Sequence, residues 1–331
     1  MAKVVRFHEL GGPEVLRIED IDVGEPGPGE VRLRVQAIGL NRAEALFRAG
    51  HYLEAAKLPA RLGYEAAGIV DAIGPDVADL AVGDAVAVVP AFSLNAYGMY
   101  GDVVLAPAHA VVRTPDRVTP VEAAAVWMQY LTAYVALIDI AGLGSGDFVI
   151  IPAASSSVGL AAIQITRMVG ATAIATTRSG RKADALREAG AQHVIATERD
   201  DLAAEVKKIT GGAGARVVFD PVAGPFVETL AEACAPGGVF FIYGLLSMRP
   251  TPFPTLAALG KGLALRGYTL FEIVSDPDRF ARGRAFVLDG LAKGALKPII
   301  ARTFPLEQIV EAHRYMEAGE QFGKIVVTVE G

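Results

Sequence analysis

Residues 147–182 read DFVIIPAASSSVGLAAIQITRMVGATAIATTRSGRK, and this stretch decides the fold. It contains an apolar strand at 148–151, a turn of small residues at 153–157, a helix that begins near 158, and a second strand at 172–177. In a Rossmann unit, a buried strand leads through a tight turn into a helix whose N-terminal N–H groups and dipole face a pyrophosphate. The stretch therefore predicts a dinucleotide-binding turn.

The turn departs from the G-x-G-x-x-G pattern of such sites. Its counterpart, ASSSVG at 154–159, keeps only the last glycine. Alanine and serine are small enough for the backbone to approach a phosphate, and serine hydroxyls can donate to it, but neither takes a positive φ as readily as glycine. The alternative is an ordinary strand-to-helix turn in an α/β protein that binds no nucleotide.

Basic residues follow the second strand, in the run RSGRK at 178–182. An NAD site places Asp or Glu in this region to hold the ribose 2′-OH, whereas a guanidinium or ammonium group suits a 2′-phosphate. The sequence therefore predicts NADPH as the cofactor, with Arg178 and Lys182 as partners of the 2′-phosphate. The alternative is a solvated charged surface, which is common after a strand.

The composition limits the class of protein. A chain of 331 residues with 52% hydrophobic content can supply two hydrophobic cores. The net charge is −6 and there is no basic block, so we expect neither nucleic acid nor a membrane as a partner. The one cysteine, Cys234, excludes an internal disulfide, and the N-terminus lacks the apolar core of a signal peptide. We expect a soluble cytoplasmic protein.

The pattern of elements changes near Thr119. Short apolar segments separated by Gly and Pro turns precede it, as in a partly open barrel or sandwich. The run TPVE at 119–122 has a first-turn proline and the residues of a capping box, and it opens an apolar helix that extends to about Ala141. Strands and helices then alternate, which is typical of a parallel doubly wound sheet.

The C-terminal tail is predicted to return to the first domain. It contains two expected helices, at 277–293 and 306–318, and an expected strand at 324–329. We therefore predict an α/β protein with a discontinuous β-rich domain at 1–122 and 272–331, and a Rossmann NADPH-binding domain at 123–271.

Seven short segments occur in the order found in one family and extend over nearly the whole chain. They are GLN at 39–41, GHY at 50–52, LGYEAAG at 62–68, VGD at 82–84, LTA at 131–133, PGG at 236–238 and GKIV at 323–326. On these residues the chain resembles the medium-chain dehydrogenase/reductase superfamily, and specifically its zinc-independent NADPH:quinone oxidoreductase branch. The resemblance implies a GroES-like catalytic barrel domain and a Rossmann domain.

The zinc ligands of the family are absent from the sequence. Zinc-dependent members carry Cys where this chain has Asn41 and His where it has Tyr64, and they hold a second zinc on a four-cysteine lobe. A catalytic zinc needs three good protein ligands, and Glu65 alone does not make a site. We therefore predict a zinc-independent enzyme with no metal site.

The absence of a Lewis acid favours a conjugated acceptor. A quinone that takes a hydride becomes a delocalised phenolate, so one or two hydrogen-bond donors suffice to stabilise it. By position, Asn41 and Tyr52 match the polar residues that the family carries near the nicotinamide and substrate, and they are the expected catalytic residues. The Asn41 amide and the Tyr52 O–H are expected to donate to the acceptor oxygen. Asn41 also has the position of a helix N-cap, and Tyr52 that of a partly buried loop aromatic.

The resemblance assigns cofactor contacts by position. These are Asn41 and Thr132 near the nicotinamide, Ser156, Ser157, Val158 and Gly159 on the pyrophosphate, Thr177, Arg178 and Lys182 on the 2′-phosphate, Gly244 by the carboxamide, and Lys324 near the cofactor.

The resemblance also implies a homodimer, through edge pairing of the sheet near 264–271, and a small-molecule quinone or enone substrate. Two alternatives stay open. One is a 2-enoyl thioester or alkenal reductase, and the other is a non-enzymatic NADPH-binding module.

Overall fold

The computed structural model describes residues 1–330, which form two compact units. Unit 1 comprises Met1–Met128 and the C-terminal segment that begins at Pro298, and unit 2 comprises Gln129–Lys297. These boundaries differ from the predicted ones, which lie after residues 122 and 271. The second difference arises because α10 (Pro277–Ala292) packs on α9 (Phe271–Val274) and therefore belongs to unit 2.

Unit 1 contains two sheets. A seven-stranded sheet has the order β15-β16-β3-β5-β6-β8, with β7 also paired to β3, and a three-stranded sheet has the order β2-β1-β4. The strands are β1 (Ala2–Phe7), β2 (Arg17–Ile21), β3 (Glu30–Gly39), β4 (Ala60–Arg61), β5 (Glu65–Ile73), β6 (Ala85–Val88), β7 (Val103–Pro107), β8 (Val111–Arg113), β15 (Ile300–Pro305) and β16 (Lys324–Thr328).

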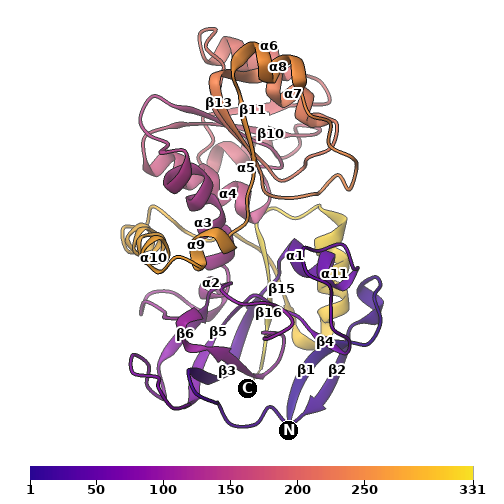
Figure 1. Ribbon diagram of the computed structural model, residues 1–331, viewed down its shortest axis with the longest axis vertical. Coiled ribbons are helices and arrows are strands. Elements are labelled where there is room, and N and C mark those ends of the chain that lie inside the picture. The colour runs from indigo at the N-terminus through magenta and orange to yellow at the C-terminus, as the bar shows by residue number, and fades with distance from the viewer. Residues whose placement is uncertain (331) are drawn as a thin grey trace. The chain divides into compact units, whose positions relative to one another are not determined.

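The helices of unit 1 are short. They are η1 (Pro13–Val15), α1 (Arg42–Arg48), η2 (Ala108–Ala110), α2 (Pro120–Ala123), η4 (Leu306–Gln308) and α11 (Ile309–Ala318). Figure 1 shows α1 beside α11, although they are far apart in the sequence. Strand β15 was missed in the sequence, whereas β16 and α11 lie close to the predicted strand at 324–329 and helix at 306–318.

Unit 2 is built on one parallel sheet with the order β11-β10-β9-β12-β13-β14. This order is that of a doubly wound dinucleotide-binding fold, so the predicted fold class is confirmed. Its elements are β9 (Phe148–Ile151), α4 (Ser157–Met168), β10 (Thr172–Thr177), α5 (Ala183–Glu188), β11 (His193–Ala196), α6 (Leu202–Ile209), β12 (Ala215–Asp220), α7 (Phe226–Ala233), β13 (Cys234–Ile242), α8 (Thr255–Lys261) and β14 (Ala264–Gly267).

One face of this sheet packs against α6, α7 and α8 (Figure 1). Its apolar core contains Ile150 of β9, Val218 of β12 and Phe240 of β13 from the sheet, with Val206 and Leu230 from the helices, all fully buried. Such burial of β-branched and aromatic residues stabilises each strand by roughly 1.5–3 kcal/mol per side chain. The core therefore keeps the carboxyl ends of the strands, from which the loops emerge, aligned along one edge of the sheet.

The predicted apolar helix at 120–141 is interrupted. It consists of α2, a turn, α3 (Trp127–Tyr134) and the π-helical η3 (Val135–Ile140). The turn lets the backbone of Ala124 contact β3, and a Cβ atom on Gly39 would lie 1.9 Å from the Ala124 carbonyl oxygen. By length and composition Pro120–Ile140 qualifies as a membrane span, but 78% of its apolar window is buried inside the protein, and core helices of soluble proteins meet the same criteria.

Candidate cofactor and substrate site

The turn after β9 has the geometry of a phosphate-binding turn. Ser156 is the N-cap of α4, and its Oγ accepts the N–H of Gly159 at 3.1 Å. The N–H groups of Ser157 and Val158 lie in the first turn of the helix, where no intrahelical acceptor exists. The dipole of the 12-residue helix adds partial positive charge at the same place. The predicted residues therefore lie together at one helix N-terminus, whose free N–H groups and dipole suit an anion.

Two backbone details explain how this turn folds without the first two glycines of the pattern. Ala153, the residue directly before the ASSSVG run, takes a positive φ of 46°. Gly159 is retained because a Cβ atom there would lie 2.7 Å from the Cα and carbonyl oxygen of Ala154. The last glycine of the pattern therefore permits close packing of the helix on the turn, which is its role in dinucleotide-binding folds.

Lys182 lies against the turn. Its Nζ donates to Ser155 Oγ at 3.2 Å, so the N-cap residue of α5 contacts the loop after β9. Arg178, which follows Thr177 at the end of β10, has an exposed guanidinium with no acidic partner among residues 1–330. The structure thus places both predicted cations at the same edge as the helix terminus. Sequence reasoning missed Ser155, although it lies inside the ASSSVG run.

Gly244 lies in the loop after β13, and Thr132 lies in helix α3. A Cβ atom on Gly244 would lie 2.7 Å from the carbonyl oxygen of Pro221, so only glycine fits between the loops after β12 and β13. Thr132 is buried in α3, and its carbonyl oxygen accepts the Tyr268 hydroxyl at 2.5 Å. Both residues are therefore fixed by close packing.

Asp220 ends β12 at the same edge of the sheet. Its carboxylate accepts the N–H groups of Val222 and Ala223, at 2.8 and 3.0 Å, which closes a turn. Burial raises the pKa of this carboxyl to about 6, while the two N–H groups act in the opposite direction. The Asp220 side chain therefore serves to cap the turn that follows β12.

Asn41 lies at the centre of a buried polar cluster in unit 1. It is the N-cap of α1 and forms a capping box with Glu44. Its Oδ1 accepts Lys324 Nζ at 2.6 Å, and its Nδ2 lies 3.1–3.2 Å from the oxygens of Gly39, Glu44 and Glu65. Both amide hydrogens therefore already face internal acceptors, and the expected donation from Asn41 to a substrate requires one of these bonds to break.

Lys324 and Glu65 form an ion pair that is almost fully buried. Nζ and Oε2 are 2.5 Å apart, and Glu65 Oε1 also accepts the N–H of Met128 at 2.8 Å. Removal of one partner from such a pair leaves a buried charge uncompensated, which costs about 3–5 kcal/mol. Lys324, predicted to lie near the cofactor, thus positions Asn41 from a strand more than 280 residues away in the sequence.

The cluster continues through residues that the sequence did not reveal. Glu44 is fully buried and accepts the Tyr100 hydroxyl at 2.6 Å and the Tyr64 N–H at 2.9 Å. The Tyr100 oxygen lies 3.1 Å from Nε2 of His313, whose Nδ1 accepts Arg48 Nη1 at 2.7 Å. Burial raises the pKa of Glu44, and the bonds from Tyr100 and the backbone oppose this shift. Among these additional residues, only Glu44 has a local sequence signal, which is its capping-box spacing from Asn41.

Tyr52 pairs with a second tyrosine. The Tyr64 hydroxyl donates to the Tyr52 oxygen at 3.4 Å, and burial raises the pKa of both phenols. Tyr52 is half buried and therefore keeps a neutral O–H that can act as a hydrogen-bond donor at neutral pH. The backbone N–H of Tyr64 binds Glu44, so the tyrosine pair is joined to the Asn41 cluster.

No three His, Cys, Asp or Glu side chains within residues 1–330 are grouped so that they could hold a metal ion. The resemblance implies that zinc-dependent members carry ligands at the positions of Asn41 and Tyr64. Asn41 instead contacts Lys324, whose positive charge disfavours a cation beside it.

Two family models match the chain. Residues 27–116 match the alcohol dehydrogenase GroES-like domain, and residues 157–287 match the zinc-binding dehydrogenase family. The first lies within unit 1 and the second within unit 2, so both predicted domain types are confirmed.

Known proteins match the chain over almost its full length. It is 33% identical to the 2-haloacrylate reductase of a Burkholderia species, over 99% of this chain and 98% of that protein. It is 32% identical to a quinone oxidoreductase of Pseudomonas aeruginosa, over 99% of both. Among solved structures, the Escherichia coli quinone oxidoreductase complexed with NADPH matches with a TM-score of 0.90 at 28% identity, over 99% of this chain and 100% of that one. The chain therefore belongs to the medium-chain dehydrogenase/reductase superfamily, in the branch that contains the quinone oxidoreductases.

Proposed function

We propose that this protein is an NADPH-dependent oxidoreductase that transfers a hydride to a quinone or a similar conjugated carbonyl acceptor without zinc. The observation that carries the proposal is the joint position of Lys182, Ser155 and the α4 N-terminus. A cation held against a phosphate-binding turn fits a dinucleotide with an additional phosphate. The likeness to a quinone oxidoreductase complexed with NADPH supports the same cofactor.

The residues of this chain fit NADPH. The N–H groups of Ser157 and Val158 would hold the pyrophosphate, and Arg178 with Lys182 would hold the 2′-phosphate. Bound NADPH supplies the hydride. The protein binds and orients, and it offers donors to the acceptor oxygen on which negative charge develops.

Tyr52 is the proposed donor to that oxygen. Its neutral O–H is supported by Tyr64, which donates to the Tyr52 oxygen and so polarises the hydroxyl. Asn41 and Lys324 act as positioning residues, because their polar atoms are engaged with each other and with Glu65. A delocalised product anion takes its proton from water, so no strong acid is needed.

The range of acceptors is tested with a panel. NADPH oxidation is measured with quinones, 2-haloacrylates, enones and 2-enoyl thioesters as substrates. We expect turnover with quinones and with other conjugated carbonyls, a class that includes the substrate named for the Burkholderia relative. Tight NADPH binding without turnover on any acceptor would support a non-enzymatic NADPH-binding module, and a strict preference for enoyl thioesters would support the thioester reductase.

We further propose a cytoplasmic homodimer. The support for the dimer is an apolar surface at the sheet edge, where β14 is the last strand of the order. Phe253, Leu256 and Leu259 are 63%, 85% and 78% exposed in the segment that leads to β14. An exposed apolar surface beside an unpaired strand edge is an unfavourable arrangement for a monomer.

A further inference from the structure

The small sheet of unit 1 carries a row of arginines across its strands. The antiparallel register places Arg6 of β1 opposite Arg17 of β2 and also opposite Arg61 of β4. Directly opposite residues project from the same face, with Cβ atoms about 4.5–5.5 Å apart, and like charges at such positions destabilise the sheet. Three guanidinium groups therefore share one face in an arrangement that is unfavourable by itself.

Only one of the three arginines has an acidic partner. Arg6 Nη1 lies 3.1 Å from Glu19 Oε2, and the other oxygen of Glu19 lies 2.5 Å from His8 Nε2. Across residues 1–330, neither Arg17 nor Arg61 makes a side-chain hydrogen bond or ion pair. The single carboxylate of Glu19 is thus shared, and the row keeps an excess of positive charge.

Arg61 is a partly buried cation without an acidic partner among residues 1–330. Its side chain is half buried, and burial together with the neighbouring charge of Arg6 lowers the pKa of its guanidinium. A guanidinium held in such surroundings gains free energy when an anion pairs with it.

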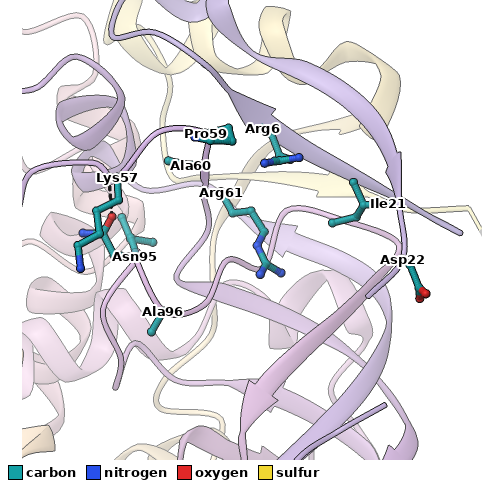
Figure 2. Close-up of a pocket in the computed structure, with 10 residues that line it drawn as sticks. Arg6, Ile21, Asp22, Lys57, Pro59, Ala60, Arg61, Asn95 and Ala96 are labelled. Carbon is teal, nitrogen blue, oxygen red and sulfur yellow. Dashed lines mark hydrogen bonds between the residues drawn. The ribbon is translucent and has the colours of Figure 1, made fainter. Parts of the chain in front are cut away.

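Arg6 and Arg61 line a cavity of about 360 Å³ (Figure 2). Lys57 adds a further cation to the lining, and the one carboxylate among the lining residues is that of Asp22. Asp22 accepts the N–H of Gly24 at 3.0 Å, and Figure 2 shows its carboxylate directed away from the two arginines. The remaining walls are Ile21, Pro59, Ala60, Leu94, Asn95 and Ala96.

We propose that this cavity binds a small oxyanion, namely phosphate or a phosphate monoester, through Arg61 and Arg6. The planar guanidinium offers parallel N–H donors that match two oxygens of a phosphate. The lining contains no aromatic ring on which a nucleobase could stack, and the volume suits a small molecule. None of the residues that line the cavity is among those proposed to hold NADPH, so the two sites are built from different side chains.

The proposal is tested by methyl NMR on the full chain, labelled at isoleucine, leucine and alanine methyl groups. Inorganic phosphate is titrated against sodium chloride at equal ionic strength, and the signals of Ile21, Leu94 and Ala96 are followed. We expect saturable shifts with phosphate and none with chloride. Binding should weaken at least about tenfold in Arg61→Gln, because a charged hydrogen bond is lost. It should be unchanged in Arg34→Gln, a matched control at an exposed arginine of β3, and in Arg178→Gln.

A stability measurement accompanies the titration. In phosphate-free buffer, Arg61→Gln should melt no lower than the parent protein, because it removes an unpaired cation opposite Arg6. Phosphate should raise the melting temperature of the parent more than that of the variant. Glycerol 3-phosphate serves as the monoester probe, and its affinity relative to inorganic phosphate identifies which form the site prefers.

Four results would overturn the proposal. Equal methyl shifts with chloride would indicate a general ionic effect, and shifts that persist in Arg61→Gln would place the anion elsewhere. Loss of the shifts in Arg178→Gln would assign them to the nucleotide-binding unit. Failure of Arg61→Gln to fold would also contradict it, since Arg61 would then be a structural residue and not a ligand-binding one.

Discussion

His313 is a buried histidine whose two ring nitrogens are both engaged. Burial and the neighbouring charge of Arg48 lower its pKa from 6.5 to about 3. The Arg48 donor faces Nδ1, so the neutral ring carries its hydrogen on Nε2, which donates to the Tyr100 oxygen. The folded protein therefore binds a proton at this residue less readily than the unfolded chain.

This difference in proton binding between the folded and unfolded states predicts that the protein becomes less stable as the pH falls. As the pH falls from 6.5 toward 3, the unfolded state gains a proton that the folded state does not, so the free energy of unfolding should fall by up to about 1.4 kcal/mol per pH unit. Urea unfolding of the parent and of His313→Gln at pH 7.5, 6, 5 and 4 measures this. Glutamine keeps an acceptor and a donor but cannot be protonated, so its slope should be smaller. His51→Gln, at an exposed histidine, is the control, and equal slopes for the parent and His313→Gln would contradict the assignment.

We predict that Arg178 determines the preference of the protein for NADPH over NADH. Arg178→Asp should weaken NADPH binding about tenfold or more, because a charge-assisted bond to the 2′-phosphate is lost, and should bring NADH closer in affinity. Fluorescence titrations with both cofactors measure the ratio. Arg187→Asp changes the net charge equally from an exposed position in α5 and should leave the ratio unaltered. Equal affinity of the parent for NADPH and NADH would refute the prediction.

Tyr52 is expected to assist catalysis without being indispensable. Tyr52→Phe should lower kcat roughly 10-fold with NADPH affinity largely kept, because a delocalised anion loses one donor but can take its proton from water. Tyr64→Phe, which removes only the supporting hydroxyl, should have a smaller effect. Steady-state kinetics with a quinone as substrate would measure the fall in kcat for each of the two variants. Complete loss of activity in a folded, NADPH-binding Tyr52→Phe variant would instead identify an obligatory proton donor.

Among the elements, α8 and β14 govern the proposed dimer. Leu256 and Leu259 lie on α8 and are among the most exposed apolar side chains. The double variant Leu256→Lys/Leu259→Lys should be monomeric, because it places two charges in an apolar interface. Analytical ultracentrifugation at micromolar concentration tests this, with Leu53→Lys as the control at a leucine of unit 1 that is 72% exposed. A parent protein that sediments as a monomer would refute the dimer itself.

The junction of β3 and α1 shows how an element boundary becomes part of a site. Asn41 ends the extended segment as an N-cap, and the capping-box partner Glu44 returns to the Asn41 N–H at 2.7 Å. The same carboxylate also accepts from Tyr64 and Tyr100. A local helix-start signal is therefore reinforced by contacts from other parts of the chain, which holds Asn41 in one orientation.

For the whole molecule, we predict that zinc is dispensable. Treatment with a strong chelator should change neither NADPH-dependent turnover nor the melting temperature, because a structural or catalytic zinc would contribute to both. The measurement is made on protein purified without added metal, together with elemental analysis. Stoichiometric zinc in that preparation, or a fall in melting temperature after chelation, would contradict the proposal.

The sequence by itself determined the features that depend on near neighbours in the chain. The order strand, small-residue turn, helix and basic strand end in 147–182 is local, and each part is set by side-chain size, charge or periodicity. The helix that starts at Ser157, one residue before the predicted start, and the parallel sheet of unit 2 therefore agree with prediction. The family resemblance rests on the same kind of local motif.

Tertiary structure alone decided what joins distant segments. The boundary at Lys297 depends on how α10 packs, and strand β15 exists as a pairing partner of β16. Lys324 reaches Asn41, and Arg6 meets Arg61, through contacts between strands that are far apart in the chain. Such pairings depend on which side chains are buried and on the register between strands. A shift of the register by one residue would turn every side chain of a strand to the opposite face of the sheet, and no local sequence pattern encodes these pairings.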